Sequence, residues 1–199
     1  LAVARNVKAG FDIRNEGVQN IKKRMVVYGS TEVHSCNQKA CELLGLGANF
    51  FKKIVVNKDY TINIEALQKQ INLNAIADIC KQNNLWFHVD GAIGAIAMLS
   101  KQVKPQLQGI ERADSVALDL HKWLHMPFEV GCVLIKDEES HKNTFSLIPE
   151  YLAKNTRGLA SGENWFSEYG LQLSRHFRAL KVWMSIKEHG SERFGRMIT

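Results

Sequence analysis

Short apolar runs alternate with amphipathic stretches along the 199-residue chain, a pattern typical of an α/β fold. The apolar runs predict strands at Met25–Tyr28, Phe51–Val56, Leu85–Val89, Ser115–Leu118 and Gly131–Ile135. Helical spacing of apolar residues predicts helices at Leu1–Lys8, after Cys36, at Ile64–Ile71, at Leu73–Lys81 and at Leu171–Lys187. We expect most of the strands to form a parallel sheet flanked by these helices.

The stretch between the last two predicted strands is rich in ionisable side chains, namely Asp119, His121, Lys122, His125 and Glu129. A lysine at the end of a buried strand is partly desolvated, and desolvation favours the neutral, nucleophilic amine. Lys122 is therefore a candidate to form an imine with a carbonyl group. The alternative is an ordinary solvated lysine in a loop, which is the commoner situation.

A second strand, Leu85–Val89, brings Asp90 to its carboxyl end, where ligands bind in open α/β sheets. A carboxylate and a lysine at such a position are the two protein groups that pyridoxal phosphate requires. The lysine forms the imine, and the carboxylate keeps the pyridine nitrogen protonated so that the ring can accept electrons. The pair Asp90 and Lys122 therefore points to this cofactor.

Four motifs occur in order along the chain: Trp86–Ala92 (WFHVDGA), Ala113–Trp123 (ADSVALDLHKW), Ile148–Leu152 (IPEYL) and Arg175–Trp183 (RHFRALKVW). With them the sequence resembles the group II pyridoxal-phosphate-dependent amino-acid decarboxylases, the branch that includes aromatic-L-amino-acid decarboxylase. The resemblance implies the large domain of fold type I, which is like that of aspartate aminotransferase: a mostly parallel sheet between two layers of helices.

The resemblance also assigns residues around the cofactor. Lys122 would hold it covalently, and Asp90 would face the pyridine nitrogen. His34 matches the histidine that stacks on one face of the ring, and Ala92 would lie against the opposite face. His121 and Asp119 flank the lysine, and His121 is the candidate to hydrogen-bond the phosphate. No metal ligand is expected in such a site.

Tyr151 matches a tyrosine that the family carries on a loop over the active site, often that of the neighbouring subunit. Its phenol would protonate the substrate α-carbon after carbon dioxide leaves. The resemblance thus implies decarboxylation of an L-amino acid, and Trp123 favours an aromatic one. It also implies a homodimer.

Other functions remain open from the residues alone. Within the fold these are an acidic-amino-acid decarboxylase, an aldehyde synthase or an aminotransferase. From other classes, His88, Asp90, His121 and His125 could serve a metal-dependent hydrolase, and a basic binding module without catalysis is the third option.

The resemblance predicts that residues 1–199 form one cofactor-binding large domain that is incomplete. The family's phosphate-binding turn would precede Leu1, and its small domain would follow Thr199. Two predicted helices meet at Asn72 and Leu73 with no strand between them, which breaks the alternation of a parallel sheet. We therefore expect that residues are missing between Asn72 and Leu73.

The composition of the chain limits the kinds of partner and the cellular location that we expect. No apolar run approaches the ~20 residues of a membrane helix, and no signal peptide is evident at the N-terminus. The net charge is +6, but basic residues are interleaved with acids, which argues against nucleic acid. The four cysteines lack Cys-x-x-Cys or disulfide-like spacing, so we expect reduced thiols and a cytoplasmic location.

Overall fold

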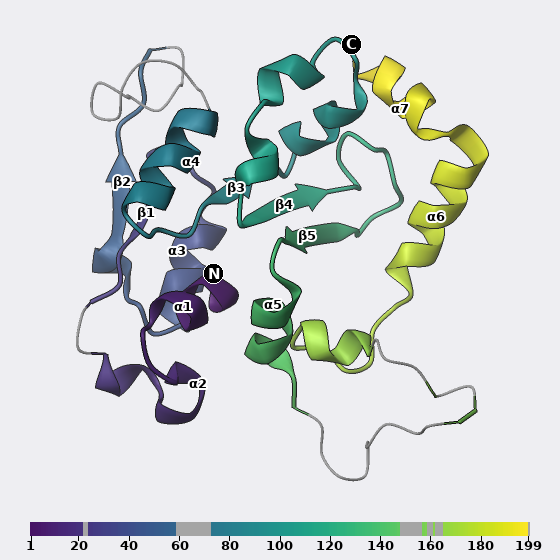
Figure 1. Ribbon diagram of the computed structural model, residues 1–199. Coiled ribbons are helices and arrows are strands. Elements are labelled where there is room, and N and C mark those ends of the chain that lie inside the picture. The colour runs from purple at the N-terminus through teal and green to yellow at the C-terminus, as the bar shows by residue number, and fades with distance from the viewer. Residues whose placement is uncertain (22–23, 59–72, 148–156, 159–160, 162–164, 199) are drawn as a thin grey trace. The chain divides into compact units, whose positions relative to one another are not determined.

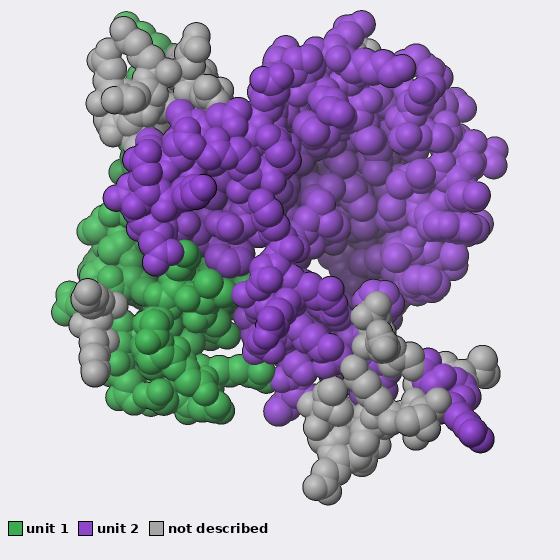
Figure 2. All heavy atoms as spheres, in the orientation of Figure 1, with its two compact units in different colours: residues 1–72 green, residues 73–199 purple. Residues whose placement is uncertain are grey.

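The computed structural model describes residues 1–21, 24–58, 73–147, 157–158, 161 and 165–198 (Figure 1). The helix predicted at Ile64–Ile71 lies outside these residues. The chain divides into two compact units, Leu1–Asn72 and Leu73–Thr199 (Figure 2). Each unit contains a sheet of its own.

The first unit is built around two parallel strands, β1 and β2, which pair from Val27↔Phe51 to Ser30↔Ile54. Parallel strands need a long crossover, and helix α3 lies within it. The elements of the unit are α1 (Ala2–Lys8), α2 (Ile13–Glu16), η1 (Val18–Asn20), β1 (Val27–Ser30), α3 (Cys36–Leu43), η2 (Ala48–Phe50) and β2 (Phe51–Ile54). The predicted helix at Leu1–Lys8 is confirmed, whereas β1 starts two residues later than predicted.

Helix α3 ends just before two glycines. Gly45 and Gly47 have φ values of +73° and +84°, which side chains with a Cβ rarely adopt. After this turn the chain enters β2, whose first residue, Phe51, is buried. The core of this unit also contains Cys41, and burial raises the pKa of its thiol.

The second unit contains a three-stranded sheet in the order β3-β4-β5. Strand β4 pairs in parallel with β3 and antiparallel with β5. The elements are α4 (Leu73–Gln82), β3 (His88–Asp90), η3 (Gly94–Leu99), η4 (Lys104–Leu107), η5 (Ile110–Arg112), β4 (Ser115–Asp119), β5 (Gly131–Ile135), α5 (Glu138–Phe145), η7 (Phe166–Tyr169), α6 (Arg178–His189) and α7 (Ser191–Met197). The predicted strand Gly131–Ile135 is confirmed residue for residue.

Two apolar clusters stabilise this unit. Ala77 of α4 packs with Phe87 and Ala113, and Val89 and Val116 of the sheet lie against the same cluster. A second cluster joins the residues after β4 to the C-terminal helices; its buried members are Ile96, Leu124, Met126, Val130 and Phe194. Ser115 of β4 is buried and its other four residues are half-buried, so the strand is less buried than its apolar sequence predicts.

Helix α6 is shorter than predicted, and most of its apolar side chains are exposed. The helix starts at Arg178 instead of Leu171, and Leu173 and Phe177 are 68% and 74% exposed. Val182 packs against the second cluster, but Trp183 and Met184 are also exposed. The described part of this unit therefore leaves most of the predicted stripe uncovered.

Gly195 permits the close packing of α7 (yellow in Figure 1) on η3. A Cβ added at Gly195 would overlap the carbonyl oxygen of Leu99 and lie 2.8 Å from its carbon. Because backbone cannot move aside as a side chain can, we expect Gly195→Ala to lower the free energy of unfolding by roughly 1–3 kcal/mol. Urea denaturation measures this, with Gly94→Ala as the control because a Cβ there meets nothing within 4 Å. Equal midpoints for the two variants would contradict the packing described.

Among the described residues, no helix has the length and apolar character needed to cross a bilayer.

Candidate active site

The carboxyl ends of β3 and β4 lie side by side, because the two strands are parallel neighbours. Their pairing continues beyond β3: the Gly91 N–H donates to the Ala117 carbonyl (2.9 Å), and the Asp119 N–H donates to the Ala92 carbonyl (3.1 Å). The segment that begins with Asp90 is therefore held beside the segment that leads to Lys122. This is the arrangement that the sequence predicts for the two residues.

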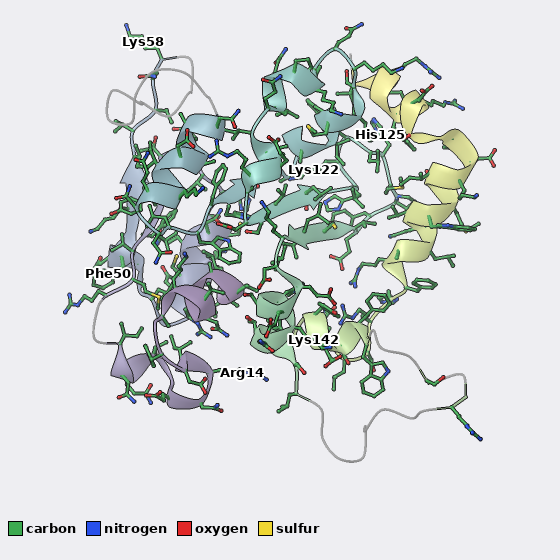
Figure 3. All side chains as sticks on the ribbon, viewed as in Figure 1. Arg14, Phe50, Lys58, Lys122, His125 and Lys142 are labelled. Carbon is green, nitrogen blue, oxygen red and sulfur yellow. The ribbon has the colours of Figure 1, made fainter. Side chains whose placement is uncertain are left out.

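Asp90 and Asp119 project from the same face of the sheet. Asp90 lies opposite Ala117 in the register, and residues opposite one another share a face. Asp119 follows Ala117 by two positions, so it lies on that face too. The Lys122 Nζ is 2.8 Å from the Asp119 Oδ2, which brings the amine to the same side of the sheet (Figure 3).

The ion pair between Lys122 and Asp119 is a feature that the sequence did not reveal. The side chains are 40% and 29% exposed, so the amine is accessible while it is held. The Lys122 N–H also donates to the Asp119 carbonyl (3.0 Å), which closes a tight turn after β4. Before it can attack a carbonyl, the amine has to give up both its proton and this ion pair.

His121 is oriented by the chain that enters β5. The Val130 N–H donates to the His121 Nδ1 at 2.9 Å, and the Phe128 ring meets the imidazole edge-on with centroids 4.8 Å apart. Because Nδ1 accepts this bond, the ring proton of neutral His121 lies on Nε2. An N–H donor next to Lys122 suits the phosphate that was predicted to bind here.

Asp90 and Ala92 belong to one turn at the end of β3. The Ala92 N–H donates to the Asp90 Oδ1 at 3.3 Å, and the carboxylate is exposed. Gly91 between them has no room for a side chain, because a Cβ would lie 2.5 Å from the Ala95 Cβ and 3.0 Å from the Ala117 oxygen. The turn therefore depends on glycine at this position.

His88 shares the Asp90 face and is bound to β4. The Ser115 hydroxyl accepts a hydrogen bond from the Trp86 Nε1–H (2.8 Å) and lies 2.8 Å from the His88 Nδ1. Because a hydroxyl can accept two hydrogen bonds and donate one, it pairs with His88 Nδ1 in either tautomer of the imidazole. Partial desolvation lowers the pKa of His88, and the Asp90 charge opposes that shift.

We expect His88 to make folding sensitive to acid. Its pKa is lower in the folded chain than in the unfolded one, so the unfolded state binds protons more readily. The free energy of unfolding should therefore fall as the pH drops below about 6.5. In a His88→Gln variant, urea denaturation between about pH 7 and pH 5 should show a shallower decline. Identical pH slopes for the two proteins would exclude this role.

The remaining predicted residues lie in three different parts of the chain. His34 belongs to the first unit and lies before α3, where its Nδ1 accepts the Cys36 N–H at 3.2 Å. Tyr151 lies outside the described residues. His125, expected to be structural, has φ +53° and donates its N–H to the Lys122 carbonyl (3.1 Å).

The described residues do not provide the metal ligands that a metal-dependent hydrolase requires. Within the described ranges, no three His, Cys, Asp or Glu side chains converge in a way that could hold a metal ion. His88, Asp90, His121 and His125 therefore do not form such a group.

Two contacts near the site were missed by sequence reasoning. Arg178 forms an ion pair with Glu129 (2.5 Å), and the Lys181 Nζ donates to the Pro127 carbonyl (2.8 Å). Both cations belong to the motif Arg175–Trp183, to which no chemistry was assigned. The motif was the signal available in the sequence, but the residues that its cations contact could be identified only from the structure.

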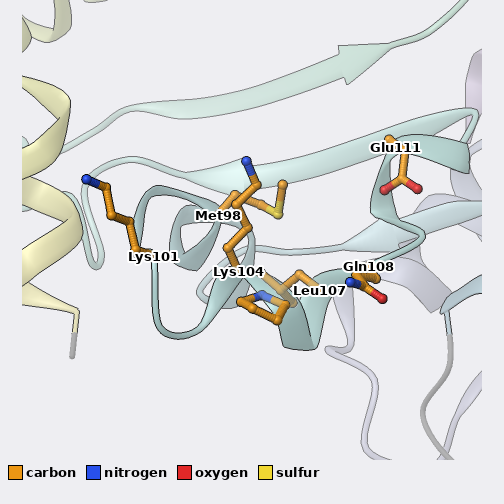
Figure 4. A pocket seen from close by; sticks show the side chains of 7 residues that line it. Met98, Lys101, Lys104, Leu107, Gln108 and Glu111 are labelled. Atoms are coloured by element: carbon orange, nitrogen blue, oxygen red, sulfur yellow. The ribbon is translucent and has the colours of Figure 1, made fainter.

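A shallow recess lies elsewhere in the second unit, between η3, η4 and η5 (Figure 4). Its volume is about 260 Å³, and its lining includes Met98, Lys104, Leu107 and Glu111. None of the described site residues lines it.

Comparison with known proteins decides the family. The pyridoxal-dependent decarboxylase conserved domain matches residues 72–199, which include Asp90, His121 and Lys122. This chain belongs to the pyridoxal-dependent decarboxylase family. The resemblance of the four motifs is thereby confirmed.

Relatives within the family cover the whole chain. Aromatic-L-amino-acid decarboxylase of Bacillus atrophaeus is 38% identical over 224 residues, which take in 100% of this chain and 45% of the relative. Two solved structures, mouse CSAD and Oryza sativa TDC with PLP and tryptamine, are 25% identical with TM-scores of 0.83 and 0.81. Each match covers 98% of this chain and 45% of the other. The chain thus spans less than half the length of the relatives it matches.

The predicted fold class is confirmed by these comparisons: the pyridoxal-dependent decarboxylases share the α/β architecture of fold type I. The site of this family member also fits the cofactor on its own chemistry. A carboxylate and an amine emerge on one face of adjacent parallel strands, and an imidazole N–H donor is next to the amine. Asp90, Lys122 and His121 are the residues that would hold pyridoxal phosphate.

Proposed function

We propose that this chain is the cofactor-binding part of an L-amino-acid α-decarboxylase, which converts its substrate to the amine and carbon dioxide. The observation that carries the proposal is the placement of Asp90 and the Lys122–Asp119 pair on one face of the sheet, at the carboxyl ends of neighbouring strands. Family membership supplies the reaction class.

Pyridoxal phosphate supplies an electron sink for the pair of electrons left behind when the carboxylate departs. Lys122 would hold the cofactor through its Nζ. The Asp90 carboxylate keeps a proton on the pyridine nitrogen. Asp119, 2.8 Å from the Lys122 Nζ, stabilises the ammonium while the substrate occupies the site. The His121 Nε2–H binds the phosphate.

Three further residues complete the proposed site. His34 would stack on one face of the pyridine ring, and Ala92 would lie against the other, where only a small side chain leaves room. Tyr151 gives a proton to the substrate α-carbon, and this step separates amine formation from other outcomes. Their support is the match of His34, Ala92 and Tyr151 to the family motifs.

The proposed substrate is an aromatic L-amino acid. The support comes from the relatives, since the Bacillus atrophaeus protein is named for aromatic amino acids and the Oryza sativa structure contains tryptamine. Trp123, directly after the lysine, fits that branch of the family.

The alternatives differ in their products, so one experiment decides among them. The protein is incubated with pyridoxal phosphate and with L-tryptophan, L-tyrosine, L-histidine or L-glutamate, and the products are separated by mass. We expect carbon dioxide and an aromatic amine in equal amounts. An aldehyde with ammonia would identify an aldehyde synthase, a keto acid an aminotransferase, and turnover of L-glutamate alone an acidic-amino-acid decarboxylase.

We also propose that the protein is a homodimer. Apolar side chains of one continuous segment are exposed in the single chain, among them Leu171, Leu173, Phe177, Trp183 and Met184. Monomers rarely expose so much apolar surface, and a second copy would cover it. Sedimentation velocity of the full-length protein should give the mass of two chains, and a monomer at micromolar concentration would argue against the proposal.

The two units are proposed to be parts of one domain from which a segment is missing. Their boundary falls at Asn72 and Leu73, and their sheets are separate. In addition, an alignment of 224 positions that contains all 199 residues must leave about 25 positions of the relative opposite gaps. A tryptic digest of the native protein should lack the peptide Gln70–Lys81. Its detection would show that the two helices are truly adjacent.

A cytoplasmic location is the proposal that best fits the cysteines. All four lie among the described residues, and they are thiols, with no disulfide between them.

A further inference from the structure

The start of helix α6 binds the segment that follows Lys122 at two points. The Arg178 guanidinium forms an ion pair with the Glu129 carboxylate (2.5 Å), and the Lys181 Nζ donates to the Pro127 carbonyl (2.8 Å). The two cations are three positions apart, so they project from the same side of the helix. The backbone before Phe128 and the side chain after it are thereby held to α6.

The held segment is the one that orients His121. Val130, which directly follows Glu129, is buried and donates its N–H to the His121 Nδ1 (2.9 Å). The Phe128 ring contacts the same imidazole edge-on, with an angle of 65° between the planes, although 82% of Phe128 is exposed. Both groups that touch His121 therefore sit on residues adjacent in sequence to the two that α6 contacts.

Apolar packing already joins these elements without the two cations. Val182 of α6 packs against the cluster that contains Leu124, Met126 and Val130. Attachment of the helix therefore does not require contacts at Pro127 and Glu129. What the polar contacts add is a defined path for the backbone between Met126 and Val130.

We propose that Arg178 and Lys181 are positioning residues for the cofactor phosphate. They hold residues 127–130 so that the Val130 N–H keeps the His121 Nδ1 as an acceptor, and His121 then offers an Nε2–H donor to the anion. Assignment of that anion as the phosphate of pyridoxal phosphate rests on the proposed function. The effect of Arg178 and Lys181 on the Val130–His121 hydrogen bond does not depend on the proposed function.

The experiment compares an Arg178→Gln/Lys181→Gln double variant with Lys187→Gln in ¹⁵N-labelled protein. Lys187 is a cation of the same helix that lies over the Trp183 ring instead of the held segment. In the wild type and in Lys187→Gln, a scalar coupling should be measurable across the Val130 N–H···Nδ1 bond. In the double variant this coupling should be lost, and the Val130 amide should exchange with solvent about tenfold faster.

A second measurement distinguishes positioning from general support. We expect the double variant to bind pyridoxal phosphate about three- to tenfold more weakly, the scale of one hydrogen bond, while its affinity for pyridoxal, which has no phosphate, stays unchanged. Arg178→Lys, which keeps a cation opposite Glu129, should recover part of the loss. Glu129→Gln tests the same ion pair from the other side if the double variant does not fold.

Persistence of the coupling in the double variant, or equal weakening of pyridoxal and pyridoxal phosphate, would overturn the proposal. A protein that binds pyridoxal phosphate with these properties but releases no carbon dioxide would leave the positioning role intact and remove the proposed reaction. If the protein binds neither pyridoxal nor pyridoxal phosphate, the scalar coupling between Val130 and His121 alone decides whether the positioning role holds.

Discussion

Replacing Lys122 by arginine is expected to reduce decarboxylation by about a thousandfold or more, the scale on which loss of a covalent catalyst is felt. Arginine keeps a positive charge that can pair with Asp119, which lies 2.8 Å from the Lys122 Nζ. However, a guanidinium stays protonated and does not form the bond to the cofactor carbonyl. The variant therefore removes the nucleophile and preserves the ion pair. Carbon dioxide release under saturating substrate measures the effect.

The control for this variant is Lys136→Ala. Lys136 follows β5 and its Nζ reaches the Glu111 carbonyl at 3.4 Å, so it is a lysine at the end of a strand of the same sheet without a place in the site. Its activity should stay within about twofold of the wild type, as expected for a surface change. Comparable activity of Lys122→Arg and wild type would remove Lys122 from the mechanism.

Asp90→Asn is expected to lower kcat by about 10²- to 10³-fold, as removal of one preorganised electrostatic contact does. Asparagine has nearly the same shape and can still accept the Ala92 N–H, which donates to the Asp90 Oδ1 at 3.3 Å. It has no charge with which to keep the pyridine nitrogen protonated. The electron sink is therefore weakened while the turn after β3 is kept. Steady-state kinetics with saturating cofactor give kcat.

The charge argument for Asp90 has its own test. A cofactor methylated at the pyridine nitrogen carries a permanent positive charge, so it should restore part of the activity of Asp90→Asn. Asp114→Asn is the matched control, because the Asp114 carboxylate binds the Phe87 N–H (2.7 Å) where the two strands begin, away from their carboxyl ends. Equal losses in Asp90→Asn and Asp114→Asn would mean that the effect is structural.

Strand positions were the most predictable part of the fold. Gly131–Ile135 is an unbroken apolar run, and the structure has β5 with the same bounds. Local pattern suffices there because a short, continuous apolar run is by itself typical of a strand. Prediction from the local pattern failed at α6, where the apolar spacing from Leu171 onward predicted a helix. The helix begins at Arg178, and no capping side chain at Phe177 marks that start.

Helix α5 was missed for the opposite reason. Its sequence, Glu138–Phe145, is almost entirely polar, so it has no apolar face to indicate a helix. The available signal was Asp137, whose side chain accepts the Ser140 N–H at 2.8 Å. An aspartate followed by two glutamates is a favourable helix start, because the carboxylates complement the free N–H groups of the first turn.

The candidate site, like the fold, has features that the sequence predicts and features that it does not. The sequence could predict that Asp90 and Lys122 lie at the same edge of the sheet, because one ends a strand and the other follows the next strand within three residues. The partners of these residues could not be predicted. The bond from Val130 to His121 joins residues nine positions apart, and the pair of Arg178 and Glu129 joins residues 49 apart. Such contacts depend on how the turn after β4 folds back, which no local pattern describes.

The central claim is that Lys122 carries the cofactor, and borohydride reduction tests it most directly. The protein is loaded with pyridoxal phosphate, reduced with borohydride, digested and mapped by mass spectrometry. We predict a single pyridoxyl group, attached to the Nζ of Lys122. A pyridoxyl group on another lysine, or on none, would contradict the account.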